Sequence, residues 1–405
     1  MPMLRYMSSI RRWFLWVAIL CVCYGAASAQ EFRIVRNGVE YAEATRTIDG
    51  LPVRMNLLRL DISKVRLDVV HAGSGVIGTE TTSSIAKRNN AIAAVNAGFF
   101  RLDQTMFAGD PAGIFQINGK LLSESNNNRI ALLIDNREDE VRDPSARVSM
   151  MHLGTFGEFW SREYRFNISG IDRERKENDA VLYTPEFGSA TPQSDPKAVE
   201  VVIENKRIKA IRESNGETPI PPNGFVLSAV GTRKAELSSM VSAGNEAIII
   251  LGAFANKGSD PTFTGRMAFI ETEDIVGGVP QLINNGKIDI TWEREKTTRS
   301  FVETRHPRTA VALLKDGRFL MITVDGRSES SGGISLFDLA QWLLELGAID
   351  AMNLDGGGST TMHLEGQVVN HPSDKEGERK VSDALIVTPR SSPMKTPIRR
   401  KTSTR

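Results

Sequence analysis

Three consecutive glycines directly after an apolar strand are the feature that most restricts how this chain can fold. The segment NLDGGGSTTM covers residues 353–362 and follows the apolar run AIDAM. Glycine loses more conformational entropy on folding than any other residue, and it has no side chain that could fill a core. We therefore predict that this strand ends at a rim, where Asp355 and bare backbone amides face an anionic ligand. The alternative is a tight loop that only needs positive φ.

Strand patterns dominate the rest of the chain. TAVALLKDGRFLMITV (309–324) predicts a hairpin around the turn KDGR. SLFDLAQWLLELG (335–347) predicts a helix that Ser335 caps and Gly347 ends. We predict an α+β fold with mixed, mostly antiparallel sheets, short helices and a single large catalytic domain, with the functional site at a rim of strand ends.

The first 29 residues have the pattern of a secretory signal peptide. An apolar run follows three arginines, and the small residues Ala27-Ser28-Ala29 precede a predicted cleavage before Gln30. An uncleaved anchor is the alternative, although the run is short for a membrane span. Both cysteines lie in this segment, so the mature chain would form no disulfide and no thiolate metal site. We expect an exported protein, periplasmic or extracellular, with no stable membrane span after cleavage.

The formal charge of +1 hides an acidic body. The tail 391–405 holds five basic and no acidic residues, and residues 1–29 hold three basic and none acidic. The remaining 42 basic residues stand against 49 acidic ones, a balance of −7, which does not suit a nucleic-acid-binding protein. We predict a signal peptide (1–29), an N-terminal strand region (30–79), a catalytic domain (80–390) and a basic disordered tail (391–405).

The tripeptide Asp-Gly-Arg occurs twice in different settings. Residues 316–318 lie between two apolar runs and predict an ordinary hairpin turn. Residues 325–327 end a strand and are followed by SESSGG, with no strand to return into. We predict that Asp325 and Arg327 belong to a binding or catalytic site.

Further polar residues lie near predicted strand ends. Asn96 ends the apolar run AIAAVN, Arg308 opens a strand and could bind a phosphate, and the polar segment 371–380 contains Glu378 and Arg379. A surface ion pair for Arg308 and a solvated loop for residues 371–380 are the alternatives. The zinc motif HEXXH, the serine-hydrolase motif GXSXG and the phosphate-binding P-loop pattern are absent from the sequence.

Taken together, these motifs resemble the phosphodiester glycosidase family, and in particular its exported bacterial members. The resemblance covers roughly 80–388 and rests on an ordered set of motifs. They are NAGFF (96–100), LYTPEFG (182–188), HPRTAV (306–311), TVDGR (323–327), LELGA (344–348), NLDGGGSTTM (353–362) and GER (377–379). The sequence departs from the family pattern at Ala312, Thr360 and Lys380, which puts substrate choice in doubt more than fold or reaction class.

The resemblance implies hydrolysis of a sugar-1-phosphodiester at the anomeric carbon, with a phosphorylated glycan or glycolipid as substrate. On this basis the expected catalytic residues are Asp325, Asp355 and Glu378. The expected substrate-binding residues are Asn96, Arg308, Arg327, Gly356, Gly357, Gly358, Ser359, Thr360 and Arg379. A phosphate leaving group needs positive charge and hydrogen-bond donors around it, which these residues can supply. The sequence requires no cofactor.

Two other functions fit the same residues. Asp325, Asp355 and Asn96 are hard oxygen ligands for calcium or magnesium, which would suit a metal-dependent phosphodiesterase that cuts the P–O bond. A non-catalytic envelope protein that holds phosphorylated glycan is the third hypothesis. Exopolysaccharide, teichoic-type polymers and glycolipid phosphodiesters all remain candidate substrates.

Overall fold

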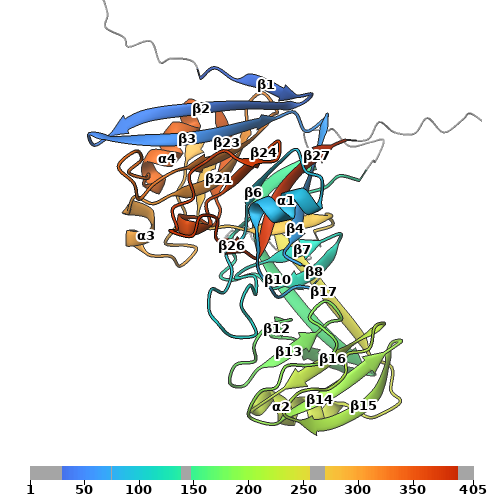
Figure 1. Ribbon diagram of the computed structural model, residues 1–405. Helices are drawn as coiled ribbons and strands as arrows, with labels where there is room; N and C mark the ends of the chain where they lie inside the picture. Colours follow the sequence, from blue (N-terminus) through green and yellow to red (C-terminus); the bar gives the residue numbers. More distant parts are fainter. Residues whose placement is uncertain (1–29, 74, 138–146, 256–269, 391–405) are drawn as a thin grey trace, which may run out of the picture. The chain divides into compact units, whose positions relative to one another are not determined.

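The computed structural model describes residues 30–73, 75–137, 147–255 and 270–390 (Figure 1). The predicted signal peptide (1–29) and basic tail (391–405) lie outside the described residues. No helix in the described part of the chain is long and apolar enough to cross a membrane.

The sheet that carries the two Asp-Gly-Arg segments has eight antiparallel strands. In order across the sheet these are β1 (Arg33–Arg36), β2 (Val39–Ile48), β3 (Leu51–Leu60), β22 (Phe319–Val324), β21 (Arg308–Leu314), β23 (Ala348–Asn353), β19 (Gln281–Asn284) and β20 (Lys287–Ile288). Its central strands are buried on both faces, so they read as continuous apolar runs. Helix α4 (Leu336–Glu345) packs on one face through Leu339 and Leu343.

A second sheet covers the other face. Its strands are β25 (Gln367–Val368), β24 (Met362–Leu364), β6 (Ala93–Asn96), β27 (Asp383–Pro389) and β4 (Val65–His71). One hydrophobic core joins the two sheets, with Met321 and Met352 from the first and Val95 and Leu385 from the second. Helix α1 (Thr82–Arg88) covers the far side of the second sheet, and the short strands β5 (Glu80–Thr81) and β26 (Lys380–Val381) pair beside it.

Two further sheets are built from the middle of the chain. The third contains β11 (Tyr164–Asn167), β10 (Val148–Ser161), β9 (Ile130–Ile134), β18 (Asp274–Gly277), β7 (Phe115–Ile117) and β8 (Lys120–Ser123), with β17 (Ile248–Ala255) paired to β10. The fourth contains β12 (Gly170–Ile171), β13 (Ala180–Tyr183), β16 (Gly224–Ala229), β14 (Ala198–Glu204) and β15 (Arg207–Ser214). Phe159 of β10 and Leu237 of α2 (Thr232–Met240) lie in the core that joins these sheets.

The predicted mostly antiparallel architecture is confirmed: of the named strand pairs, only β12 and β13 are parallel. The predicted helix is α4, which begins after Ser335, whose hydroxyl accepts a hydrogen bond from the backbone N–H of Asp338 (3.1 Å). Gly347 follows with φ +90°. The label α+β overstates the helices, because in the described ranges α1, α2, α3 (Arg299–Glu303) and α4 are the only α-helices.

Candidate active site

The ends of three neighbouring strands bring the predicted site residues to one edge of the first sheet. Strand β21 is antiparallel to both β22 and β23, so those two strands end beside the start of β21. Asp325 directly follows β22, Asp355 lies two residues after β23, and Arg308 opens β21. The prediction of polar residues gathered at a rim of strand ends therefore agrees with the topology.

Asp325 lies in the floor of this edge and is only 4% exposed. One carboxylate oxygen accepts hydrogen bonds from the backbone N–H of His371 (2.9 Å) and the side-chain amide of Asn370 (3.3 Å). Burial raises the pKa of Asp325, while these donors and the charge of Arg54 oppose the rise. The carboxyl is therefore held in a fixed orientation by residues from the polar segment that follows β25.

Asp355 is anchored by its backbone, and the residue as a whole is partly exposed. Its N–H donates to the carbonyl of Ala97 (2.9 Å), and its carbonyl accepts from the side-chain amide of Asn96 (2.7 Å). Burial raises the pKa of Asp355 to about 6, and Ser359, Gly356 and Arg379 act against the rise. A carboxyl with this pKa can take up or release a proton close to neutral pH.

The three glycines allow other side chains to approach the backbone very closely. A Cβ atom at Gly358 would lie 2.2 Å from both Arg379 Nη2 and Asp374 Oδ1. One at Gly357, where φ is +61°, would lie 3.0 Å from Arg327 Nη2. The glycine turn thus brings two arginines against the strand end that carries Asp355.

The backbone amides of this turn are largely occupied within the protein. The N–H groups of Gly356, Gly357, Ser359 and Thr360 donate to Asp355 Oδ1 (2.8 Å) and to the carbonyls of Pro307, Gly356 and Gly357. The side chains of Ser359 and Thr360 are buried. Positive charge at the site therefore comes mainly from the arginine side chains, and less from the amide cradle that we predicted.

The three arginines occupy different environments. Arg327 is exposed; its Nη1 donates to Ser373 Oγ (3.4 Å) and lies 4.0 Å from Asp374 Oδ1. Arg379 is held by Asp374 through hydrogen bonds of 2.8 and 3.1 Å. Arg308 is only 2% exposed, and burial lowers its pKa to about 10. Among these three, Arg327 is the arginine best placed to receive a phosphate.

Arg308 binds the loop below the site. Its guanidinium donates to the carbonyls of Phe301 (2.7 Å) and Thr304 (2.8 Å), and it lies over the Phe301 ring at 5.1 Å. These contacts fix the end of α3 against the start of β21. We had considered a phosphate contact or a surface ion pair for Arg308, and its observed contacts match neither.

Asn96 and Glu378 also make internal contacts. Asn96 is fully buried, and its side-chain oxygen accepts from Thr309 Oγ1 (2.7 Å) and the N–H of Thr361 (3.1 Å). Glu378 Oε2 accepts from the N–H of Ser83 (3.0 Å) in the first turn of α1. Asn96 therefore supports Asp355 from below, and Glu378 fastens the polar segment to α1.

The structure adds residues that we did not single out. His306 lies beside Arg308 and Arg327, whose charges and its own partial burial lower its pKa. Asp374 holds Arg379 and lies near Arg327, and Asp383 raises the pKa of Asp355. His306 begins a motif that we quoted, and Asp374 lies in the polar segment, so a sequence signal existed for both.

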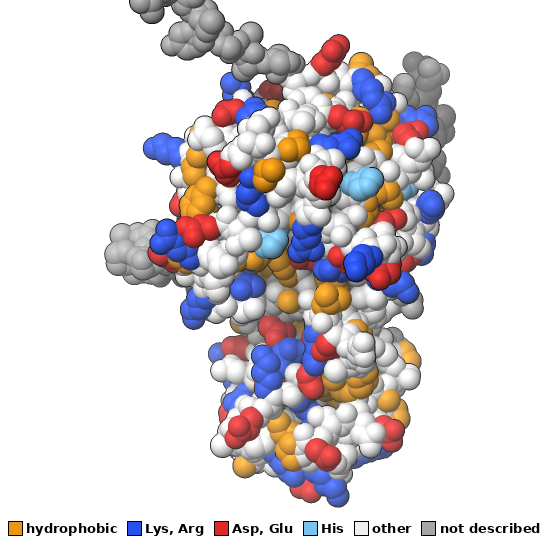
Figure 2. Space-filling view, turned by 60° about the vertical axis from the view of Figure 1, so that its left-hand side comes forward, with side chains coloured by type: hydrophobic (Ala, Val, Ile, Leu, Met, Phe, Trp, Pro, Cys, Tyr) orange, Lys and Arg blue, Asp and Glu red, His pale blue; other side chains and the backbone are white. Residues whose placement is uncertain are grey.

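Acidic and basic side chains are interspersed over the face of the molecule shown in Figure 2. Among the described residues, no group of three or more His, Cys, Asp or Glu side chains is arranged to hold a metal ion.

Comparison with known families gives an independent view of this edge. The family model described as phosphodiester glycosidase matches residues 197–388, which include Asp325, Asp355 and Glu378. This match supports the assignment of the chain to the phosphodiester glycosidase family.

One curated relative shares local sequence with this chain. It is N-acetylglucosamine-1-phosphodiester alpha-N-acetylglucosaminidase of Bos taurus, which is 38% identical over 109 residues. The match covers 25% of this chain and 20% of the bovine protein. The chain therefore spans about a fifth of the length of that relative.

Two solved structures resemble the fold as a whole. A Burkholderia pseudomallei protein described as exported has a TM-score of 0.70 and 25% identity, and the match covers 84% of this chain and 74% of that one. A hypothetical protein from Synechocystis has a TM-score of 0.73 and 21% identity, with 90% of this chain and 64% of that chain covered. The second match concerns the fold alone.

Proposed function

We propose that this protein is an exported hydrolase that cleaves the C1–O bond of a sugar-1-phosphodiester. The products are the free sugar and a phosphomonoester. The observation that carries the proposal is the pair Asp325 and Asp355, which follow two strands that end at the same edge, beside the exposed Arg327. The match to the phosphodiester glycosidase family model supports the reaction class.

The chemistry divides into two parts. A phosphate leaving group carries its negative charge readily and needs electrostatic stabilisation more than protonation. Arg327 and the Arg379–Asp374 pair lie against the glycine turn, where they would bind that phosphate. The anomeric carbon must then be attacked by a carboxylate or by a water molecule that a carboxylate activates.

Asp355 suits the role that needs proton exchange. Burial raises the pKa of its carboxyl to about 6, so Asp355 changes protonation within the range where a general acid or base works well. Asp325 is more deeply buried and fixed by His371 and Asn370, which suits a carboxylate that must keep one orientation. We assign both as catalytic residues. Whether the reaction retains or inverts the anomeric configuration would show which of them acts as nucleophile, acid or base.

For the substrate we propose a glycan of the cell envelope or the extracellular space. The N-terminal sequence pattern predicts export, and a structural neighbour at 25% identity is described as an exported protein. The exposed arginine favours a substrate that carries phosphate at the point of cleavage.

The test uses purified protein and an alpha-N-acetylglucosamine-1-phosphodiester, with the release of free sugar as the signal. Asp355→Ala should abolish release, while Asp316→Ala, a change in the other Asp-Gly-Arg segment, should leave it unchanged. Hydrolysis in oxygen-18 water should place the label on the sugar. Label on the phosphate would indicate P–O cleavage and contradict the proposal, as would wild-type activity in a folded Asp355→Ala variant.

Activity should also survive chelation of divalent cations. Loss of activity in chelator that calcium or magnesium restores would favour the metal-dependent phosphodiesterase instead. Saturable glycan binding without product after long incubation would favour a binding protein.

A further inference from the structure

A second buried carboxyl lies behind Asp355, on the other side of the end of β6. The N–H of Gly98 donates to Asp383 Oδ1 (2.6 Å), and the N–H of Ala97 donates to the Asp383 carbonyl (3.3 Å). The carbonyl of the same Ala97 accepts the N–H of Asp355 (2.9 Å). Residues 96–98 are therefore held between Asp355 on one side and Asp383 on the other.

Gly98 packs tightly against the carboxylate of Asp383. A Cβ atom at Gly98 would lie 3.2 Å from both carboxylate oxygens of Asp383. Asp383 is completely buried, and the hydroxyl of Ser382 donates to its second oxygen. A buried carboxyl is costly unless it is fully hydrogen-bonded, and an asparagine could accept the same bond from Gly98 at lower cost. Packing alone therefore does not explain an acid here.

His71 is the titratable neighbour of Asp383. The two residues are directly opposite in the antiparallel pair of β27 and β4, so their side chains lie on the same face of the sheet. Burial lowers the pKa of His71 below its usual value, the charge of Asp383 opposes this fall, and the charge of Arg88 adds to it. The Nδ1–H of the His71 ring donates to the Ala72 carbonyl (2.7 Å), and the ring packs edge-on against Phe115.

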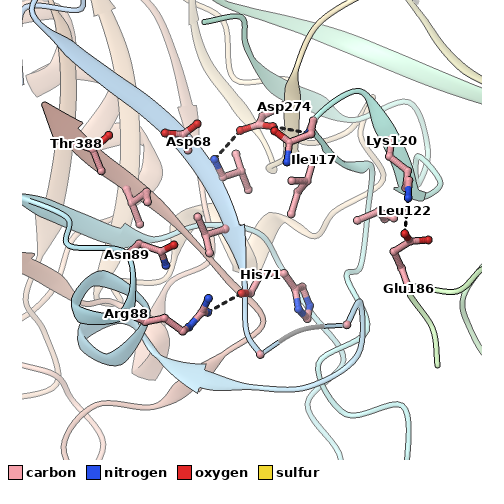
Figure 3. A pocket seen from close by; sticks show the side chains of 16 residues that line it. Asp68, His71, Arg88, Asn89, Ile117, Lys120, Leu122, Glu186, Asp274 and Thr388 are labelled. Carbon is pink, nitrogen blue, oxygen red and sulfur yellow. Dashed lines mark hydrogen bonds and ion pairs between the residues drawn. The ribbon is translucent and has the colours of Figure 1, made fainter. Parts of the chain in front are cut away.

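His71 also lines a cavity of about 580 Å³ (Figure 3). Asp355 is not among the residues that line this cavity, so the cavity is separate from the strand edge that carries Asp355. The charged residues drawn there have partners: Arg88 binds the His71 carbonyl (2.9 Å), and Asp274 accepts two backbone amides. Lys120 and Glu186 pair with each other. Of the buried pair, His71 lines this cavity and Asp383 does not.

We propose that Asp383 is a positioning residue for Asp355, and that His71 and Asp383 form a buried ionisable pair that controls when Asp355 gives up its proton. The inference rests on the proposed function of Asp355. The groups that act on these three side chains are Arg379 at Asp355 and Arg88 at His71, and both lower the pKa of the group they face. The charge of Asp383 acts to raise the pKa of both Asp355 and His71.

The experiment measures sugar release by the full chain against pH in the wild type and in Asp383→Asn. Removing the Asp383 charge should move the limb of the rate profile that reports Asp355 to lower pH, by roughly half a unit or more. Asp274→Asn is the matched control, because Asp274 is another buried acid with a raised pKa that accepts two backbone amides. Its profile should not move.

A second measurement does not depend on turnover. The titration of the His71 ring, followed by NMR, should shift to lower pH in Asp383→Asn and stay in place in Asp274→Asn. If the wild type releases no sugar while His71 shifts as expected, the proposed function fails and the buried pair stands. A folded Asp383→Asn variant with an unmoved rate limb overturns the positioning role.

Should Asp383→Asn not fold, His71→Gln decides the question. The positive charge of a protonated His71 lowers the pKa of Asp383, so without this ring Asp383 holds its proton to higher pH and presents less negative charge to Asp355. The rate limb should again move to lower pH, by less than in Asp383→Asn. An unchanged limb in folded His71→Gln would overturn the pair.

Discussion

The tripeptide Asp-Gly-Arg occurs at both ends of strand β22, and the two copies have opposite roles. At residues 316–318 the aspartate and the arginine pair with each other across a hairpin turn, and Glu40 adds a second acid to Arg318. At residues 325–327 no such pair forms: Asp325 is buried under Asn370 and His371, while the Arg327 side chain is exposed.

The comparison shows that the place of each copy in the sheet, and not the tripeptide itself, determines the role of its aspartate and arginine. The first copy joins two paired strands, so its charged groups satisfy each other in solvent. The second copy leaves the sheet at the edge where β23 also ends, so its acid meets the polar segment that follows β25. Separating an acid from its neighbouring arginine leaves both groups available for a ligand.

The largest expected difference is between Asp325→Asn and Asp316→Asn. A catalytic carboxyl that acts on a proton or a nucleophile contributes about 10²–10⁴-fold to the rate, so Asp325→Asn should lower kcat/KM by at least about 100-fold. Asp316→Asn loses only an exposed ion pair and should stay within about twofold. Sugar release measures both, with circular dichroism to confirm folding. Equal effects of the two changes would show that the copies are not distinct.

The second largest expected difference is between the kcat/KM values of Arg327→Met and Arg318→Met. A charge-assisted hydrogen bond to phosphate contributes about 1.5–3 kcal/mol, so Arg327→Met should weaken kcat/KM by about 10- to 100-fold. Arg318→Met removes contacts with Asp316 and Glu40 far from the site and should change little. The KM and kcat of both variants are measured on the same phosphodiester. An unaffected Arg327→Met variant would mean that another group binds the phosphate.

The local parts of this comparison could be predicted from sequence. The hairpin, the capped helix α4 and the strand that ends before Asp355 all follow from patterns within about 15 residues. The different settings of the two Asp-Gly-Arg segments were also visible, because a returning strand follows only the first. The fold and the rim of strand ends thus depend on signals that sequence carries directly.

The roles of single polar side chains could not be predicted in the same way. Arg308 turns to the carbonyl of Phe301, and Asn96 reaches a carbonyl 259 positions away, at Asp355. Sequence places these residues at strand ends but does not say which side of the edge they face. Asp383 was missed because it begins an otherwise apolar strand, where an acid resembles an ordinary strand boundary.

Gly326 and Gly317, the glycines of the two Asp-Gly-Arg copies, should differ in how much their substitution by alanine lowers the free energy of unfolding. A Cβ atom at Gly326 would lie 2.9 Å from both the Gly333 Cα and the Pro307 nitrogen, and backbone atoms cannot give way easily. Gly326→Ala should therefore cost about 1–3 kcal/mol in unfolding free energy and also lower activity. Gly317 has open space around it and φ +82°, so Gly317→Ala should cost about 1 kcal/mol from strain alone, with activity unchanged. Urea unfolding measures both.

The smallest expected difference between the two copies is in how Asp316 and Asp325 make the free energy of unfolding depend on pH. The hydrogen bond from Arg318 holds the pKa of Asp316 below its usual value, so Asp316 stabilises the fold above about pH 4 and this contribution is lost as pH falls through the lower folded pKa. Burial raises the pKa of Asp325, so its contribution is present at low pH and is lost as pH rises above about 4. From pH 3 to pH 7, Asp316→Asn should lose stability relative to the wild type, and Asp325→Asn should gain it. Urea midpoints across that range give the sign, and two variants that change in the same direction would remove the electrostatic basis for treating the two copies as different.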